Sequence, residues 1–140
     1  MISENKPVES AREFMQRMNS ELRRDYTFRG RKYTDLCLVL AIKIGKKLLN
    51  EGHIPHIEKL IAPSTRSRQI VPLAYGGRVQ WGIHCFCVSD QEVWDPVIGV
   101  PVPIADYQLR LIGETLHREA HFSPEKLRDD DENKIIVSFD

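Results

Sequence analysis

The feature of this sequence that most constrains its fold is a helix without a polar face. Residues 36–42 contain only aliphatic side chains and one cysteine. Thr34 or Asp35 can cap the start of a helix over residues 34–51, and Gly52 can end it in a left-handed conformation. Because a helix that is apolar all round must be buried on most sides, we expect this one to lie across a sheet at the centre of the domain.

The rest of the chain has the patterns of further helices and of a run of neighbouring strands. Apolar residues at three- and four-residue spacings predict an amphipathic helix over residues 8–24. Strands are predicted over residues 56–62, 69–75, 78–88 and 92–95, with a tight Gly76-Gly77 hairpin between the second and the third. Short helices are expected over residues 105–112 and 114–121, and an edge strand over residues 134–139. This order predicts an α+β fold with an antiparallel sheet.

Composition and charge exclude several classes of function. The 140 residues suit one domain, and twenty basic side chains balance twenty acidic ones. Without a global positive field, neither nucleic acid nor an anionic membrane surface is an expected partner. The N-terminus lacks the apolar core of a signal peptide, and the longest nearly apolar stretch is about half as long as a membrane-spanning helix. We expect a cytoplasmic protein, with export by a non-classical route left open.

Three polar side chains stand in otherwise apolar segments. Cys37 lies in the first turn expected for the buried helix, where unpaired N–H groups and the helix dipole favour a thiolate. His84 interrupts an apolar strand, and Asp95 interrupts the next one. A carboxylate beside the imidazole would fix its tautomer and leave the other ring nitrogen facing a nucleophile. The alternatives are a buried structural thiol and a core histidine with satisfied hydrogen bonds.

The hairpin between the two strands decides whether His84 can meet Asp95. A loop of Ser89 and Asp90 would put the two residues directly opposite each other. A loop of Asp90 and Gln91, or of residues 89–92, would make them diagonal neighbours on one face. A three-residue loop would put them on opposite faces. A catalytic pair therefore requires an even register or a compensating bulge.

The three residues in this order resemble a known family. A cysteine at the start of a buried helix, a histidine on a strand and an Asp-Pro pair on the next strand are similar to the transglutaminase-like branch of the papain-like cysteine enzymes. The likeness is closest in residues 82–88 and 93–96. The proline-containing continuation through residue 107 resembles small bacterial members, including papain-fold domains of toxin systems. The resemblance covers about residues 33–107.

This resemblance implies an α+β, papain-like core in which the helix that begins with the cysteine packs on an antiparallel sheet. Residues 1–140 would form a single domain. Residues 1–30 would supply an N-terminal helix and connector, residues 31–107 the catalytic core, and residues 108–140 a C-terminal extension.

The resemblance also implies roles for individual residues. Cys37 would be the nucleophile, His84 the base and then the acid, and Asp95 the orienting carboxylate. The Cys37 N–H could stabilise an oxyanion. Weaker candidates for an oxyanion or substrate contact are the side chains of Tyr33, Gln80 and Trp81. The expected reaction is hydrolysis, deamidation or transamidation at an amide bond of a protein or peptide substrate, without a cofactor.

Two other functions remain open at this point. The same fold with a buried, inactive Cys37 would serve as a protein-binding module. A metal site could use the pairs Cys85 and Cys87, His53 and His56, or His117 and His121. The Cys-x-Cys spacing does not match structural zinc sites, His53 and His56 flank Pro55 in a turn, and no carboxylate-rich pattern supports His117 and His121. We therefore expect no metal, and core packing for the two strand cysteines. With only three cysteines, a disulfide framework is not expected either.

Overall fold

The computed structural model describes residues 8–24, 33–62 and 70–122. Within these residues the fold is α+β, as predicted, and no helix is long and apolar enough to cross a membrane. The elements in chain order are α1 (Ala11–Arg24), α2 (Tyr33–Asn50), β1 (His56–Ile61), the 3₁₀ turn η2 (Leu73–Tyr75), β2 (Ile83–Ser89), β3 (Glu92–Trp94), β4 (Val102–Pro103), α3 (Ile104–Ile112) and β5 (His117–Phe122).

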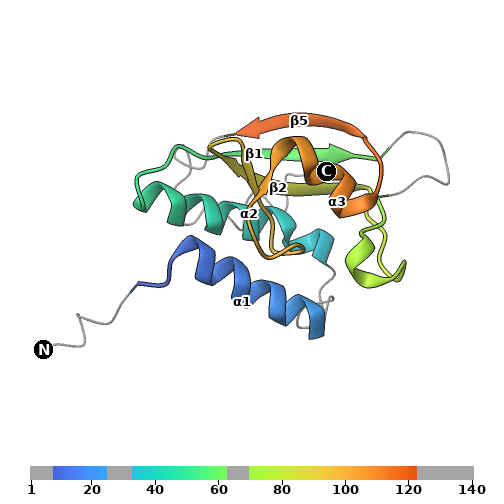
Figure 1. The fold of residues 1–140 in the computed structure, drawn as a ribbon, viewed down its shortest axis with the longest axis horizontal. Helices are drawn as coiled ribbons and strands as arrows, with labels where there is room; N and C mark the ends of the chain where they lie inside the picture. Colours follow the sequence, from blue (N-terminus) through green and yellow to red (C-terminus); the bar gives the residue numbers. More distant parts are fainter. Residues whose placement is uncertain (1–7, 25–32, 63–69, 123–140) are drawn as a thin grey trace, which may run out of the picture.

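The strands form one sheet in the order β4-β3-β2-β1-β5, with every neighbouring pair antiparallel. Helix α2 lies between this sheet and α1, so the sheet, α2 and α1 form three successive layers (Figure 1). This position explains why the first half of α2 has no polar stripe, because one side packs on strands and the other on a helix. Its buried residues are Cys37, Leu38, Leu40, Ala41, Ile42, Ile44 and Leu48.

The amphipathic helix predicted near the N-terminus is confirmed as α1. Its apolar face is buried, with Phe14, Met15 and Met18 all less than a tenth exposed. The helix begins at Ala11 and not at residue 8, because Ser10 forms a capping box. The Ser10 hydroxyl accepts the Glu13 N–H at 3.0 Å, and the Ser10 N–H donates to the Glu13 carboxylate at 2.9 Å.

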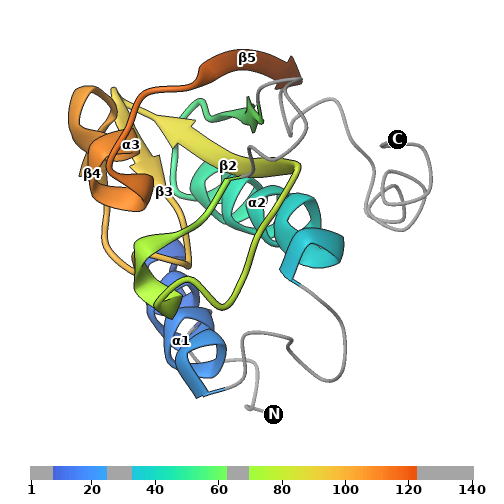
Figure 2. The same ribbon diagram turned by 90° about the vertical axis from the view of Figure 1, so that its right-hand side faces the viewer.

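The strand predicted over residues 69–75 is wrong. Of its described residues, 70–75, only Ile70 pairs in strand fashion, in an isolated bridge with Trp81, and Leu73–Tyr75 form the turn η2. Pro72 precedes this turn and Gly76 ends it with a left-handed φ of 60°, so the segment curls instead of extending. Gly76 and Gly77 therefore do not join two long strands. In Figure 2, η2 lies between α1 and α3.

The C-terminal part of the described chain differs from expectation in one element. Helix α3 confirms the predicted short helix and ends at Ile112, followed by Gly113 as the C-cap with a φ of 78°. The second short helix is wrong: His117–Phe122 form β5, paired with β1. The edge of β1 offers unpaired backbone groups, and pairing with them overrides local helix propensity. The edge strand predicted over residues 134–139 lies outside the described residues.

Candidate active site

The β2–β3 hairpin has the two-residue loop of Asp90 and Gln91. Both residues have positive φ, 56° and 65°, as expected for the primed turns that match the twist of a hairpin. The last pair before the loop is Ser89 with Glu92. Of the registers considered above, this one makes His84 and Asp95 diagonal neighbours on the same face of the sheet.

The chain turns away from β2 immediately after β3, and Asp95 forms that turn. Its backbone carbonyl accepts the N–H groups of Ile98 and Gly99 at 3.0 and 2.9 Å, and its side chain accepts the Val97 N–H at 2.9 Å. The paired part of β3 therefore ends at Trp94, opposite Cys87.

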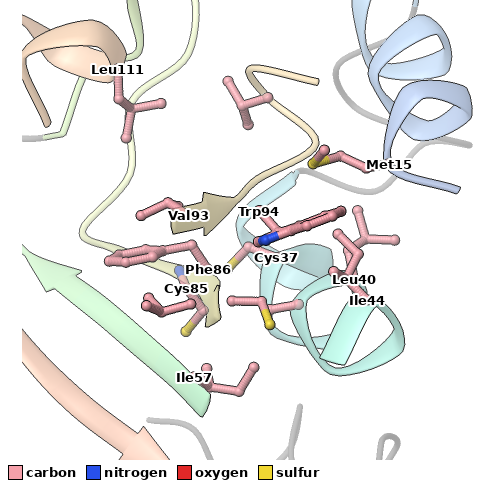
Figure 3. Packing of buried hydrophobic residues seen from close by; sticks show 14 of the residues in the cluster. Met15, Cys37, Leu40, Ile44, Ile57, Cys85, Phe86, Val93, Trp94 and Leu111 are labelled. Atoms are coloured by element: carbon pink, nitrogen blue, oxygen red, sulfur yellow. Dashed lines mark hydrogen bonds between the residues drawn. The ribbon is translucent and has the colours of Figure 1, made fainter. Parts of the chain in front are cut away.

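Cys37 lies beside β2 at the point where β3 no longer pairs with it, next to the pair of Cys87 and Trp94. Cys85 lies two residues before Cys87 on β2, on the side away from the hairpin loop. Its N–H donates to the Cys37 sulfur at 3.5 Å. Figure 3 shows Cys37 of α2 close to Cys85 of β2, with Trp94 beside them. The Cys37 side chain thus accepts the Cys85 N–H at a point where β3 has turned away from β2. This contact joins α2 to the hairpin.

His84 and Asp95 form a buried pair. Nε2 of His84 lies 2.7 Å from Oδ2 of Asp95, and both residues are fully buried. The hydroxyl of Tyr107, from α3, donates to the same oxygen at 2.5 Å. The Trp81 ring stacks on the imidazole, with centroids 4.4 Å apart and planes at 14°. The stacking of Trp81 therefore fixes the plane of the imidazole ring, and the contact with Asp95 fixes the direction of Nε2.

The charges of this cluster support one another against the cost of burial. Burial opposes the charged form of Asp95, yet the charge and hydrogen bond of His84 lower the pKa of the carboxyl, helped by Tyr107 and Val97. Burial also opposes the imidazolium, but Asp95 and then Cys37 raise the pKa of His84 to about 9.

The same interactions favour a thiolate at Cys37. A hydrogen bond from the Cys85 side chain lowers the pKa of Cys37 to about 5, against burial and with further help from His84. Since Nε2 of His84 is bound to Asp95, Nδ1 is the ring nitrogen left for the interaction with Cys37. At neutral pH the cluster is therefore a thiolate, an imidazolium and a carboxylate in sequence.

The weaker site candidates have different surroundings. Trp81 is buried against His84, whereas Gln80 is exposed, and the Tyr33 side chain lies outside the described atoms. Because α2 begins at Tyr33, Cys37 is its fifth residue, and its N–H has an intrahelical acceptor in α-helix geometry. The expected first-turn position of Cys37 is therefore wrong.

Two contributors were missed by reasoning from the sequence, namely Cys85 and Tyr107. The sequence predicts core packing for Cys85, and it places Tyr107 on a helix with no pattern that connects it to Asp95. Both act through tertiary contacts, and the local signal for Tyr107 is a hydroxyl on the apolar face of an amphipathic helix.

The histidine pairs considered as metal ligands are arranged differently. Nδ1 of His53 lies 2.8 Å from Asp90, and Nε2 of His56 lies 2.6 Å from Glu58. His117 and His121 belong to β5, so they do not share a helix face. Among the described residues, no group of three or more potential ligands is arranged to hold a metal ion.

A cavity of about 360 Å³ lies between the end of α1 and η2, with Arg23, Tyr75 and Arg78 in its lining. Burial, and next the charge of Asp95, raise the pKa of Tyr75. Tyr75 therefore lines the cavity and is near enough to Asp95 for the charge of that residue to affect its pKa. The cluster itself is closed, since Cys37 is only 2% exposed.

Comparison of the chain with protein families, with curated proteins and with solved structures finds no match.

Proposed function

We propose that this protein is a papain-like cysteine enzyme of the transglutaminase-like branch, in which Cys37 attacks an amide bond of a protein or peptide. The observation that carries the proposal is a buried network. In it His84 binds Asp95 at 2.7 Å and also interacts with Cys37 through a hydrogen bond and its charge. Charged groups are costly to bury, and perturbed pKa values of this kind concentrate at functional sites.

The proposed reaction has two halves. The Cys37 thiolate bonds to the carbonyl carbon, and Nδ1 of His84 gives its proton to the departing amine, which leaves a thioester. His84 then takes a proton from water or from a second amine as that group attacks, and the thiolate departs. Hydrolysis, deamidation and transamidation differ only in the leaving amine and the attacking group.

Asp95 has a positioning role in this scheme. It holds Nε2, so that Nδ1 faces the sulfur, and its charge stabilises the imidazolium. Trp81 supports the same orientation by stacking on the ring.

The pH dependence of Cys37 alkylation tests the proposal. With iodoacetamide on the native protein, the labelling rate should titrate with a midpoint near 5, well below the value of about 8.5 for a free thiol. The midpoint is the informative quantity, because burial slows labelling at every pH. His84→Ala should move the midpoint upward.

The matched control is His53→Ala, which removes a histidine bound to a carboxylate at the surface. This variant should leave the midpoint of Cys37 unchanged. A wild-type midpoint at the value of a free thiol would contradict the proposed nucleophile.

The burial of all three residues supports a second candidate, a catalytically inactive papain-like fold that binds proteins. This function predicts a lowered midpoint without turnover. Incubation with a glutamine-containing peptide separates the two, since the enzyme releases ammonia or a cleaved peptide and the binding module does neither.

A further inference from the structure

Cys85 is a nucleophilic group that the proposed reaction does not use. It is 1% exposed and lies beside Cys37, which is 2% exposed. Its N–H donates to the Cys37 sulfur at 3.5 Å, and its thiol is hydrogen-bonded to that sulfur as well. The two side chains come from different elements, α2 and β2, and point into the same part of the core (Figure 3).

The two sulfurs differ in character. The pKa of Cys37 is lowered to about 5, so this sulfur is a thiolate at neutral pH. The hydrogen bond to Cys37 raises the pKa of Cys85, followed by burial and by the negative charge of Cys37. Two of these three causes depend on the Cys37 thiolate, and they disappear once that sulfur is oxidised and neutral.

We propose that Cys37 and Cys85 form a peroxide-reactive dithiol that closes to an intramolecular disulfide. The Cys37 thiolate attacks one oxygen of hydrogen peroxide; the S–O bond forms, the O–O bond breaks, and the departing hydroxide takes a proton to become water. The Cys85 sulfur then attacks the sulfenic sulfur of Cys37. The S–S bond forms, the S–O bond breaks, and the thiol proton leaves with the hydroxide as a second water. Two thiols are oxidised, and one peroxide is reduced to two waters.

The disulfide would protect Cys37 from irreversible oxidation. A sulfenic acid without a neighbouring thiol proceeds to sulfinic and sulfonic acids, whereas a disulfide is recovered by reductants. If Cys37 is also the nucleophile proposed above, the closed disulfide would stop turnover until it is reduced.

Cys87 provides a matched control within the same strand. It is as buried as Cys85 and lies two residues further along β2, on the same face and about 7 Å away. Burial alone raises the pKa of the Cys87 thiol, with no contribution from Cys37. Cys87 should therefore take no part in the disulfide.

The test treats the native protein with hydrogen peroxide, blocks the remaining thiols and maps the peptides by mass spectrometry. We expect a linked peptide containing Cys37 and Cys85, lighter by two hydrogens and separated again by dithiothreitol. Because Cys85 and Cys87 share one peptide, fragment ions must locate the bond: a bond to the Cys87 sulfur with Cys85 blocked, or no intramolecular link, would overturn the inference. This map of the unsubstituted protein decides the pairing even if a core variant fails to fold.

Two variants add a second measurement. In Cys85→Ala, Cys37 should accumulate as sulfinic and sulfonic acid that dithiothreitol does not recover, whereas Cys87→Ala should behave as the wild type. Full recovery of Cys37 in Cys85→Ala would also contradict the inference. The peptide map reports covalent structure and not turnover. A protein that forms this disulfide but shows no activity would therefore contradict the enzyme proposal and still support the dithiol inference.

Discussion

Asp95 holds a negative charge in the protein interior because donors from three directions surround it. His84 and Tyr107 share one carboxylate oxygen, and the Val97 N–H binds the other. Removing one partner of a buried charge costs more than the bond itself contributes, because the charge stays in a poorly solvating environment.

Substituting Tyr107→Phe tests this at the scale of a single hydroxyl. We expect the free energy of unfolding to fall by about 1.5–3 kcal/mol, the range for a hydrogen bond to a charged group. The pKa of Asp95 should rise, since Tyr107 is one of the groups that lower it. Urea denaturation measures the first effect.

The control for this prediction is the same substitution in an Asp95→Asn background. If the hydroxyl acts through the carboxylate charge, Tyr107→Phe should cost less there, and the difference is the coupling free energy. Equal costs in both backgrounds would mean that the hydroxyl acts elsewhere.

Among the elements, α1 anchors the turn that carries Asp95. The Asn19 amide donates to the carbonyl oxygens of Pro96 and Val97 at 2.8 and 3.2 Å. Gly99, in the same turn, approaches Asn19 so closely that an added Cβ would lie 2.7 Å from the Asn19 side chain. The N-terminal helix therefore helps to position a residue of the charged cluster from outside the sheet.

Gly99→Ala tests this contact between elements, and Gly52→Ala is its matched control. Both glycines have a φ of +92°, but an added Cβ at Gly52 meets nothing within 4 Å. Gly52→Ala should lose about 1–2 kcal/mol of stability from backbone strain alone. Gly99→Ala should lose about 1–3 kcal/mol more from overpacking against Asn19. Equal losses of stability for the two variants in thermal or urea unfolding would show that Asn19 moves aside without cost.

Predictability varied between elements for physical reasons. α2 and the β2–β3 hairpin were foreseen because each has a local signature: an apolar helix in one case, and turn residues between apolar strands in the other. β5 was not, because its partner β1 lies more than fifty residues earlier in the chain. For a charged segment of this kind, the presence of an open strand edge decides between helix and strand.

For the whole molecule, the thiolate–imidazolium pair makes stability depend on pH in an unusual way. The pKa of His84 is raised from 6.5 to about 9, so by itself it stabilises the fold below pH 6.5, and this contribution is lost as pH rises through 9. The pKa of Cys37 is lowered from 9.0 to about 5, so its contribution is present above pH 9 and is lost as pH falls through 5.

Together these shifts predict a plateau. Between pH 6.5 and 9 the folded pair keeps its proton on His84 and the unfolded pair keeps one on Cys37, so unfolding transfers no net proton. The free energy of unfolding should be nearly flat in that range and should fall from pH 6.5 toward pH 5. In Cys37→Ala the His84 pKa loses the increase due to Cys37 but keeps that due to Asp95. Stability should therefore decline above pH 6.5, by at most about 1.4 kcal/mol per pH unit. Urea denaturation across this range measures both profiles; parallel curves for the two proteins would contradict the pair.

The amino-acid sequence alone determined that the central helix would be buried and that Cys37, His84 and Asp95 were the polar groups to examine. Burial and turn formation follow from residues close together in the chain. The tertiary structure decided which of these groups meet, that Cys85 and Tyr107 join them, and that the cluster is closed to solvent. Those outcomes depend on how α2, α3 and the hairpin dock, and docking is set by packing between segments far apart in the chain, which no local pattern records.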